Sequence, residues 1–273
     1  MTLLSTVARH WHAKGDAFAM ISVSEALGST PREVGAVMLV SAVEMAGTIG
    51  GGRLEWDAIN AARAMLEAGD SSRELTVTLG PAIGQCCGGR VVLHIKGVGT
   101  EDVEALQAAE NATHSAMPNV MIYGAGHVGR ALALALASLP FKTSLVDSRE
   151  AELSLAKSLF VKRDCVTLLH TDSAIALAET APAGTAHIIM THSHALDSLI
   201  AAAVLERNAF SYLGIIGSQT KRTSFCRAFK ELGLPAESIA RIVCPIGGNS
   251  VQDKRPEVIA ALVAAELVGV LLG

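Results

Sequence analysis

"NVMIYGAGHVGRALALALASL", residues 119–139, is the stretch that decides the fold of this chain. A short apolar run leads into the pattern G-x-G-x-x-G at Gly124, Gly126 and Gly129, and an alanine- and leucine-rich helical pattern follows. In such a turn the first glycine permits the tight bend, the second lets the backbone approach a phosphate, and the third lets the helix pack closely on the strand. The stretch therefore predicts a strand, a turn and a helix whose N-terminus can bind an anion.

The same alternation of strand and helix continues toward the C-terminus. Further short apolar strands, each followed by a helical pattern, are predicted at residues 142–148, 165–170, 186–192 and 210–217. Alternation of this kind requires right-handed crossovers and produces a parallel sheet with helices on both faces. We therefore predict an α/β fold with a Rossmann-like, doubly wound domain over residues 119–273.

The first part of the chain has a different pattern. Within residues 1–98, short strand-like runs surround one helical pattern at residues 53–69, which predicts a smaller α+β domain. Residues 99–118 are polar and rich in alanine and end in proline, so we predict a helical linker there.

Composition narrows the class of protein. The 273 residues are 50% hydrophobic and 18% charged, with a net charge of −4 and no lysine or arginine tract, which indicates a globular protein and argues against nucleic-acid or membrane partners. The first residues lack a secretory signal pattern, and the apolar runs are too short to span a bilayer. Five cysteines at irregular spacing argue against a disulfide framework. We expect a cytoplasmic location.

The glycine turn has a candidate partner at the end of the next strand. Asp147 follows the turn by about twenty residues, where an acidic side chain accepts hydrogen bonds from a ribose diol. Arg149, two residues on, suits a 2′-phosphate, so the choice between NAD and NADP stays open. His127 lies inside the turn and is predicted to face the same ligand. Alternatively, the glycines serve only the packing of helix on strand.

Two further turns follow predicted strands, at the sheet edge where ligands bind in doubly wound folds. "THSHALD" places His192 and His194 two residues apart, with Asp197 after them. A third firm metal ligand is missing, so cofactor contact or helix capping is preferred to a permanent metal site. "GSQTKR" offers a hydroxyl and two cations suited to an anionic group, at Ser218, Lys221 and Arg222.

"LGPAIGQCCGG", residues 79–89, places Cys86 and Cys87 between glycines. Their Cα atoms are about 3.8 Å apart, which is shorter than the roughly 4.4–6.8 Å of a relaxed disulfide, and a closed zinc site needs more ligands. A glycine-bordered loop leaves the thiols accessible and offers backbone N–H groups to a thiolate, which is a nucleophile or a soft-metal ligand. The alternative is a pair of small buried hydrophobic residues.

Two more loops of the first domain suit an anion. "GSTPREVGA" carries Arg32 directly after Pro31, a candidate clamp for a negative group. "GTIGGGRLE" opens a predicted helix with a possible phosphate seat made of Gly50, Gly51 and Gly52. Glu55 follows in the first turn, where a carboxylate also interacts favourably with the helix dipole.

Taken together, these stretches resemble the XdhC/CoxI family, the accessory proteins of xanthine dehydrogenase and related molybdenum hydroxylases. The resemblance covers nearly the whole chain in order, through "GSTPREVGAVMLV", "GTIGGGRLE", "LGPAIGQCCGG", "IYGAGHVGRALA", "LVDSR", "THSHALD", "YLGIIGSQTKR" and "CPIG". One segment departs from the family pattern: after "CPIG" the chain reads "GNSVQDKRPE", where Lys254 is the candidate for a lysine that the family has in this region.

The resemblance implies a non-enzymatic chaperone of the molybdenum cofactor (molybdopterin). Such a protein binds the cofactor, protects it during sulfuration with a cysteine desulfurase as sulfur donor, and delivers it to an apo molybdenum hydroxylase of the xanthine dehydrogenase type. A thiolate of Cys86 or Cys87 would contact the molybdenum transiently or carry sulfur. The glycine turns, cations and histidines named above would hold the remainder of the cofactor.

Two other functions stay open at this point. The glycine turn and Asp147 also suit an NAD(P)-dependent oxidoreductase, and the cysteine pair suits a thiol redox sensor. The C-terminal stretch "VIAALVAAELVGVLLG" is apolar nearly all round, which predicts a buried helix and is compatible with a homodimer.

Overall fold

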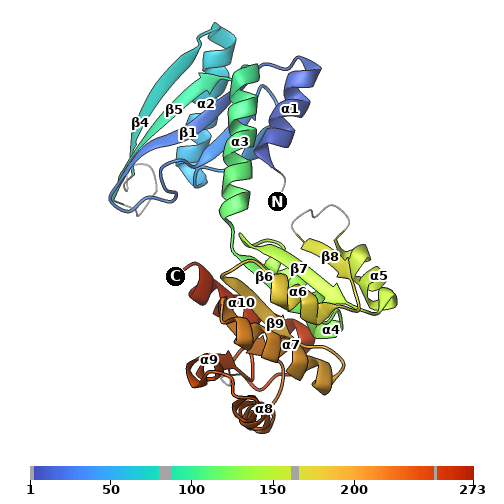
Figure 1. Ribbon diagram of the computed structural model, residues 1–273. Helices are drawn as coiled ribbons and strands as arrows, with labels where there is room; N and C mark the ends of the chain where they lie inside the picture. The colour runs from blue at the N-terminus through green and yellow to red at the C-terminus, as the bar shows by residue number, and fades with distance from the viewer. Residues whose placement is uncertain (1–2, 80–87, 161–165, 249–250) are drawn as a thin grey trace. The chain divides into compact units, whose positions relative to one another are not determined.

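Two sheets, one in each part of the chain, organise the structure (Figure 1). The computed structural model describes residues 3–79, 88–160, 166–248 and 251–273. The chain divides into a first unit, Met1–Thr113, and a second unit, His114–Gly273. This division falls inside the segment 99–118 that separates the two sequence patterns.

The first unit contains an antiparallel sheet of five strands in the order β3-β2-β1-β5-β4. The strands are β1 (Phe18–Leu27), β2 (Val37–Ser41), β3 (Met45–Gly47), β4 (Ser72–Thr78) and β5 (Arg90–Gly97). β4 and β5 pair from Ser72 opposite Lys96 to Thr78 opposite Arg90. Thr78 and Arg90, which flank the segment that contains the cysteine pair, therefore lie at the same end of the sheet.

One helix covers one face of this sheet. α2 (Gly52–Ala68) buries Leu54, Ala58, Ala62 and Met65, which recur at helical spacing and line one side of the helix. It ends at Gly69, whose left-handed backbone lets its N–H return to the last turn. Because the buried residues recur every three or four positions, the helix was predictable from the sequence.

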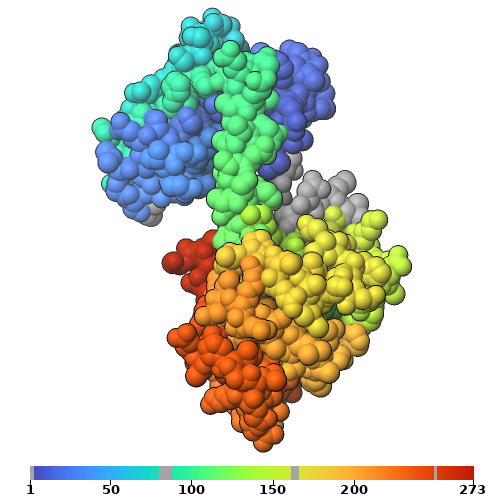
Figure 2. Space-filling model, in the orientation of Figure 1, coloured from blue at the N-terminus to red at the C-terminus, as the bar shows by residue number. Residues whose placement is uncertain are grey.

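The other face of the sheet is covered by α1 (Leu4–Lys14) and α3 (Thr100–Ala116), which pack around Trp11. α1 has no capping side chain of its own; the Glu110 carboxylate of α3 instead accepts hydrogen bonds from the N–H groups of Leu4, at 2.7 Å, and Ser5. Within α3 only Val103 is buried, and Figure 2 shows one side of the helix open at the surface along its length. The segment 99–118, which was predicted to be a helical linker, thus also caps α1 through Glu110.

The second unit contains a parallel sheet of six strands in the order β11-β10-β9-β6-β7-β8. The strands are β6 (Asn119–Tyr123), β7 (Lys142–Asp147), β8 (Val166–His170), β9 (Thr185–Ile189), β10 (Phe210–Ile215) and β11 (Ile242–Val243). Chain order reverses between β6 and β9, so ligands are expected at the carboxyl ends of these strands. The predicted fold class, Rossmann-like and doubly wound with a smaller α+β unit before it, is confirmed.

Helices lie on both faces of this sheet (Figure 1). One face carries α4 (His127–Leu136), α5 (Glu150–Leu159) and α10 (Pro256–Leu271). The other carries α6 (Ala174–Thr180), α7 (His194–Arg207), α8 (Gln219–Glu231) and α9 (Ala236–Ala240). Among the described residues, none of the helices has both the length and the apolar character needed to cross a membrane.

Candidate functional site

The glycine turn of the second unit is built as its sequence requires. Gly124 has φ of +116°, and a methyl group on it would lie 2.3 Å from the carbonyl oxygen of Met190. A methyl group on Gly129 would lie 1.9 Å from the carbonyl oxygen of Gly124, so the helix approaches the strand more closely than any other residue allows. Gly126, by contrast, faces open space directly before α4, and His127 is exposed as the first residue of that helix.

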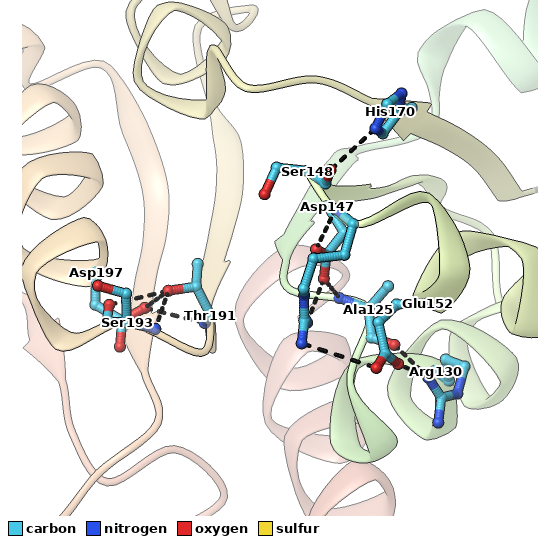
Figure 3. A network of polar contacts seen from close by, with 10 residues as sticks. Ala125, Arg130, Asp147, Ser148, Glu152, His170, Thr191, Ser193 and Asp197 are labelled. Atoms are coloured by element: carbon cyan, nitrogen blue, oxygen red, sulfur yellow. Dashed lines mark hydrogen bonds and ion pairs between the residues drawn. The ribbon is translucent and has the colours of Figure 1, made fainter.

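Asp147 ends β7 beside this turn, but its carboxylate is occupied by protein donors (Figure 3). Oδ2 accepts from the N–H of Ala125 at 2.7 Å and from Nη2 of Arg149 at 2.8 Å. Oδ1 accepts from both the backbone N–H and Nε of Arg149, each at 2.9 Å. Burial alone would raise the pKa of Asp147, but these hydrogen bonds hold it below its ordinary value.

The same contacts continue into a ring around Ala125. Arg149 lies 3.8 Å from Glu152, and Glu152 pairs with Arg130. Arg130 then donates to the carbonyl oxygen of Ala125 at 2.6 Å, so both backbone groups of this buried residue are bound. A ribose hydroxyl at Asp147 would have to displace Arg149 from this ring.

The turn after β9 is braced by its own side chains (Figure 3). Oδ1 of Asp197 accepts from the N–H of Thr191 at 3.0 Å and from its hydroxyl at 2.7 Å. The hydroxyl of Ser193 caps α7. These contacts leave His192 and His194 exposed. No group of three possible metal ligands gathers in the parts of the chain that the structure describes.

Lys221 reaches across to this brace. Its ammonium donates to Oδ2 of Asp197 and to the carbonyl oxygen of Ile216, both at 2.9 Å, and the two side chains of this pair are 13% and 1% exposed. Ser218 caps α8 through the N–H of Lys221, while Arg222 donates to the carbonyl oxygen of Ile242 at 3.4 Å. The sequence assigned Lys221 to an anionic ligand, whereas the structure pairs its charge with Asp197.

Two pockets lie at the carboxyl edge of the parallel sheet. The one beside Gly124 and Asp147, which His192 also lines, has a volume of about 80 Å³. The other lies between the start of α8 and the start of α10 and has a volume of about 740 Å³. Ser218 and Lys254 both line this larger pocket.

In the first unit, the glycine turn before α2 holds a carboxylate of the chain itself. Oε2 of Glu55 accepts from the N–H groups of Ile49 and Gly51, each at 3.1 Å, and from the hydroxyl of Thr48 at 2.6 Å. Gly50, Gly51 and Gly52 all have positive φ, as this folded-back turn requires. The sequence predicted an anion seat here, and Glu55 occupies two of its N–H groups.

The loop that carries Arg32 packs on this turn. A methyl group on Gly50 would lie 2.6 Å from the ring of Pro31, so only glycine allows the two loops to meet. Arg32 itself is 38% exposed, with Glu33 at 3.4 Å. The contact is made by Nη2, at the end of the guanidinium, and the Glu33 side chain is itself 76% exposed, so this ion pair lies in solvent.

The described residues that flank the cysteine segment lie beside the same loop. The N–H of Leu79 donates to the carbonyl oxygen of Gly89 at 2.7 Å, and this closes the loop. A methyl group on Gly89 would lie 2.5 Å from the carbonyl oxygen of Ser29, and one on Gly28 would lie 3.2 Å from the Cα of Gly89. Cys86 and Cys87 lie outside the described residues. Three motifs that are distant in sequence thus meet at one end of the antiparallel sheet.

Several polar residues of the second unit were not identified from the sequence. Glu266, the one acidic residue in the apolar part of α10, accepts from the N–H of Gly247 and from the hydroxyl of Tyr212, both at 3.0 Å. A lone carboxylate in an apolar helix is the signal that could have found it.

A second polar pair is buried in the core. The hydroxyl of Tyr123 lies 3.0 Å from Nδ1 of His187, and the two rings are nearly parallel. Burial, with a smaller contribution from the charge of Arg207, lowers the pKa of His187 to about 4. Burial also raises the pKa of Tyr123. His187 is therefore neutral at physiological pH.

Comparison with known proteins identifies the family to which the chain is similar. A model described as the XdhC Rossmann domain matches residues 120–267, and one described as the XdhC and CoxI family matches residues 11–80. The uncharacterized protein YqeB of Escherichia coli (strain K12) is 29% identical over 261 residues, which are 93% of this chain and 43% of that protein. The chain thus spans about two fifths of the length of this curated relative.

A solved structure shares the fold. The crystal structure of a xanthine dehydrogenase from Bacillus halodurans matches with a TM-score of 0.79 and 17% identity, over 98% of this chain and 95% of that one. At this identity the likeness supports the fold, and it extends over both units.

Proposed function

Because this chain belongs to the XdhC and CoxI family, we propose that it binds the molybdenum cofactor, protects it during sulfuration and delivers it to an apo molybdenum hydroxylase. The client would be an enzyme of the xanthine dehydrogenase type. In this role the chain is a chaperone without turnover of its own, and a cysteine desulfurase supplies the sulfur.

One observation carries the proposal: three family motifs meet at one end of the antiparallel sheet. Gly89, at the exit of the cysteine loop, packs on the backbone of Ser29. Two residues further on, Pro31 packs on Gly50. The pairing of Leu27 with Arg90 places these loops side by side, and the motif residues that they carry are thereby available to one ligand.

The residues of these three motifs fit the chemistry of the cofactor. Molybdenum is thiophilic, and thiolates such as those predicted for Cys86 and Cys87 are the soft ligands that protein sites use for such metals. The cofactor is also anionic, and the exposed guanidinium of Arg32 is a suitable partner for a negative group near the metal. Since Glu55 occupies two N–H groups of the adjacent glycine turn, we assign this anionic contact to Arg32.

A second function, NAD(P)-dependent oxidation or reduction, is favoured by the glycine turn of the second unit, where Gly126 leaves open space for a phosphate. The occupancy of Asp147 by Arg149 weighs against it, because a nicotinamide dinucleotide needs that carboxylate for its ribose. We therefore place the chaperone function first.

Cofactor retention tests the proposal. The purified chain is incubated with molybdenum cofactor and gel-filtered, and bound molybdopterin is assayed by the fluorescence of its oxidised form. We expect retention by the wild type, and loss in Cys86→Ala or Cys87→Ala. Cys226→Ala, which removes a half-buried thiol of α8, is the matched control and should retain the cofactor. A wild type that carries no molybdopterin but binds a nicotinamide dinucleotide would reverse the order of the two functions.

A further inference from the structure

The larger pocket of the second unit is sized for an organic ligand, whereas the pocket at the glycine turn is not. Their volumes are about 740 Å³ and about 80 Å³. Small-molecule sites span roughly 300–1,000 Å³. The smaller pocket has room for a few water molecules, so of these two pockets at the carboxyl edge of the sheet the larger is the one with space for a ligand of cofactor size.

One side of the larger pocket is apolar. It is lined by Ile216 after β10, by Ile246 in the turn after β11, and by Ile259 and Leu262 in the first turns of α10, with Val251 at its rim. Branched aliphatic side chains of this kind pack against the face of a flat ring. A heterocycle is therefore the part of a ligand that this side accommodates.

The other side of the pocket attracts an anion. Lys254 is exposed there, while its neighbour Asp253 is neutralised by two short contacts to Arg255. α8 begins at this side, and no acceptor among the described residues meets the N–H of Gln219 or of Thr220. The lysine and the helix N-terminus act in the same direction and favour a phosphate.

The walls of the pocket are held in place by buried contacts. Glu266 fixes the N–H of Gly247 at 3.0 Å, directly after Ile246. On the opposite wall, the aliphatic chain of Lys221 packs on Gly217, and its ammonium is bound to Asp197. A ligand would thus meet a preformed cavity, which lowers the ordering cost of binding.

We propose that this pocket, and not the glycine turn, holds the ligand of the second unit, and that the ligand is a phosphorylated heterocycle. The inference deepens the proposed function and rests on it, since the molybdenum cofactor carries a pterin and a phosphate. At the glycine turn, by contrast, the ring through Asp147 and Arg149 already binds the groups that a nucleotide would need.

The test measures binding of two probes to the full chain: molybdopterin released from a purified molybdoenzyme, and guanosine monophosphate. Val251→Trp places an indole at the pocket rim, and Lys254→Glu reverses the charge on its anionic side. Each should weaken binding of the preferred probe by about tenfold or more. Lys230→Glu, the same reversal at the exposed far end of α8, is the matched control and should bind as the wild type does. Unchanged thermal unfolding verifies that the variants fold.

The outcomes separate the inference from the proposed function. If the wild type binds molybdopterin and both pocket variants bind it equally well, the inference is wrong while the proposed function stands. If the wild type binds guanosine monophosphate alone, and Lys254→Glu abolishes this, the pocket is a nucleotide site and the chaperone proposal fails. If the wild type binds neither probe, both are overturned.

Discussion

Replacing Glu55 with alanine tests whether the first glycine turn depends on an internal anion. In the folded chain one carboxylate oxygen, Oε2, accepts from the N–H groups of Ile49 and Gly51 and from the hydroxyl of Thr48. The substitution removes all three hydrogen bonds without adding bulk. We expect it to destabilise the first unit and to loosen the turn on which Pro31 packs.

The magnitude follows from which of the three donors can reach water. Thr48 is exposed and Gly51 half-buried, so water replaces the carboxylate there at little cost. Ile49 is fully buried, and its N–H would be left without an acceptor. One unsatisfied buried donor costs about 1–3 kcal/mol, so we expect a loss of about 2 kcal/mol for Glu55→Ala. Glu55→Gln keeps an acceptor oxygen and loses only the charge, which should cost about half as much.

The two units can be followed separately because both tryptophans, Trp11 and Trp56, lie in the first and both tyrosines in the second. Trp11 is only 3% exposed, so its fluorescence changes on unfolding. Urea unfolding followed by tryptophan emission therefore reports the stability of the first unit. Glu67→Ala, at an exposed position of the same helix, is the matched control and should change stability by less than about 0.5 kcal/mol.

Equal stabilities for the alanine variants at Glu55 and Glu67 would refute this reasoning. Such a result would mean that water satisfies the N–H of Ile49 as well as the carboxylate does. The turn would then be open to an external anion, and the anionic contact assigned to Arg32 would return to the glycines. A loss near the expected value instead identifies Glu55 as the anion that the turn was built to hold.

Three further perturbations have defined outcomes. Glu110→Ala should cost about 1 kcal/mol of first-unit stability in the same assay, because α1 loses its cap, and Glu104→Ala should not. The pKa of His187 is about 4 in the folded chain and about 6.5 in the unfolded chain, so between these pH values only the unfolded chain takes up the proton. Acidification from pH 6.5 to 4 should therefore lower the free energy of unfolding by about 3 kcal/mol, and this contribution should be absent in His187→Gln. Asp197→Asn strands the Lys221 ammonium and should cost about 3–5 kcal/mol in urea unfolding, whereas adding Lys221→Met should recover part of the loss.

Periodic signals explain why much of the fold was predictable. Gly124 and Gly126 lie between β6 and α4, Gly129 lies in the first turn of α4, and repeated apolar strands fix the parallel sheet. Two elements carried too little pattern to be predicted: β3, with three residues, and β11, with two. Both lie at sheet edges, where pairing with one neighbour and not hydrophobic periodicity decides the conformation.

The polar partners of the candidate sites were much harder to predict. Sequence identified Lys221 and Asp197 as separate candidates, but nothing local shows that they are paired across 24 positions. The same holds for Glu266 and Gly247, which lie 19 positions apart and meet only because α10 returns to the edge of the sheet. Motif spacing identifies which groups can bind a ligand. It does not identify which of these groups are already paired with other residues of the same chain.

That distinction has a consequence for both glycine turns. Each presents backbone N–H groups that suit an anion, and each holds a carboxylate of the chain: Glu55 on Ile49 and Gly51, and Asp147 on Ala125. A ligand phosphate that displaced these carboxylates would first have to break their charge-assisted hydrogen bonds, each of which contributes about 1.5–3 kcal/mol. A cation without a buried carboxylate partner offers the same attraction without that cost. An anionic cofactor should therefore depend more on Arg32 in the first unit and on Lys254 in the second than on either glycine turn.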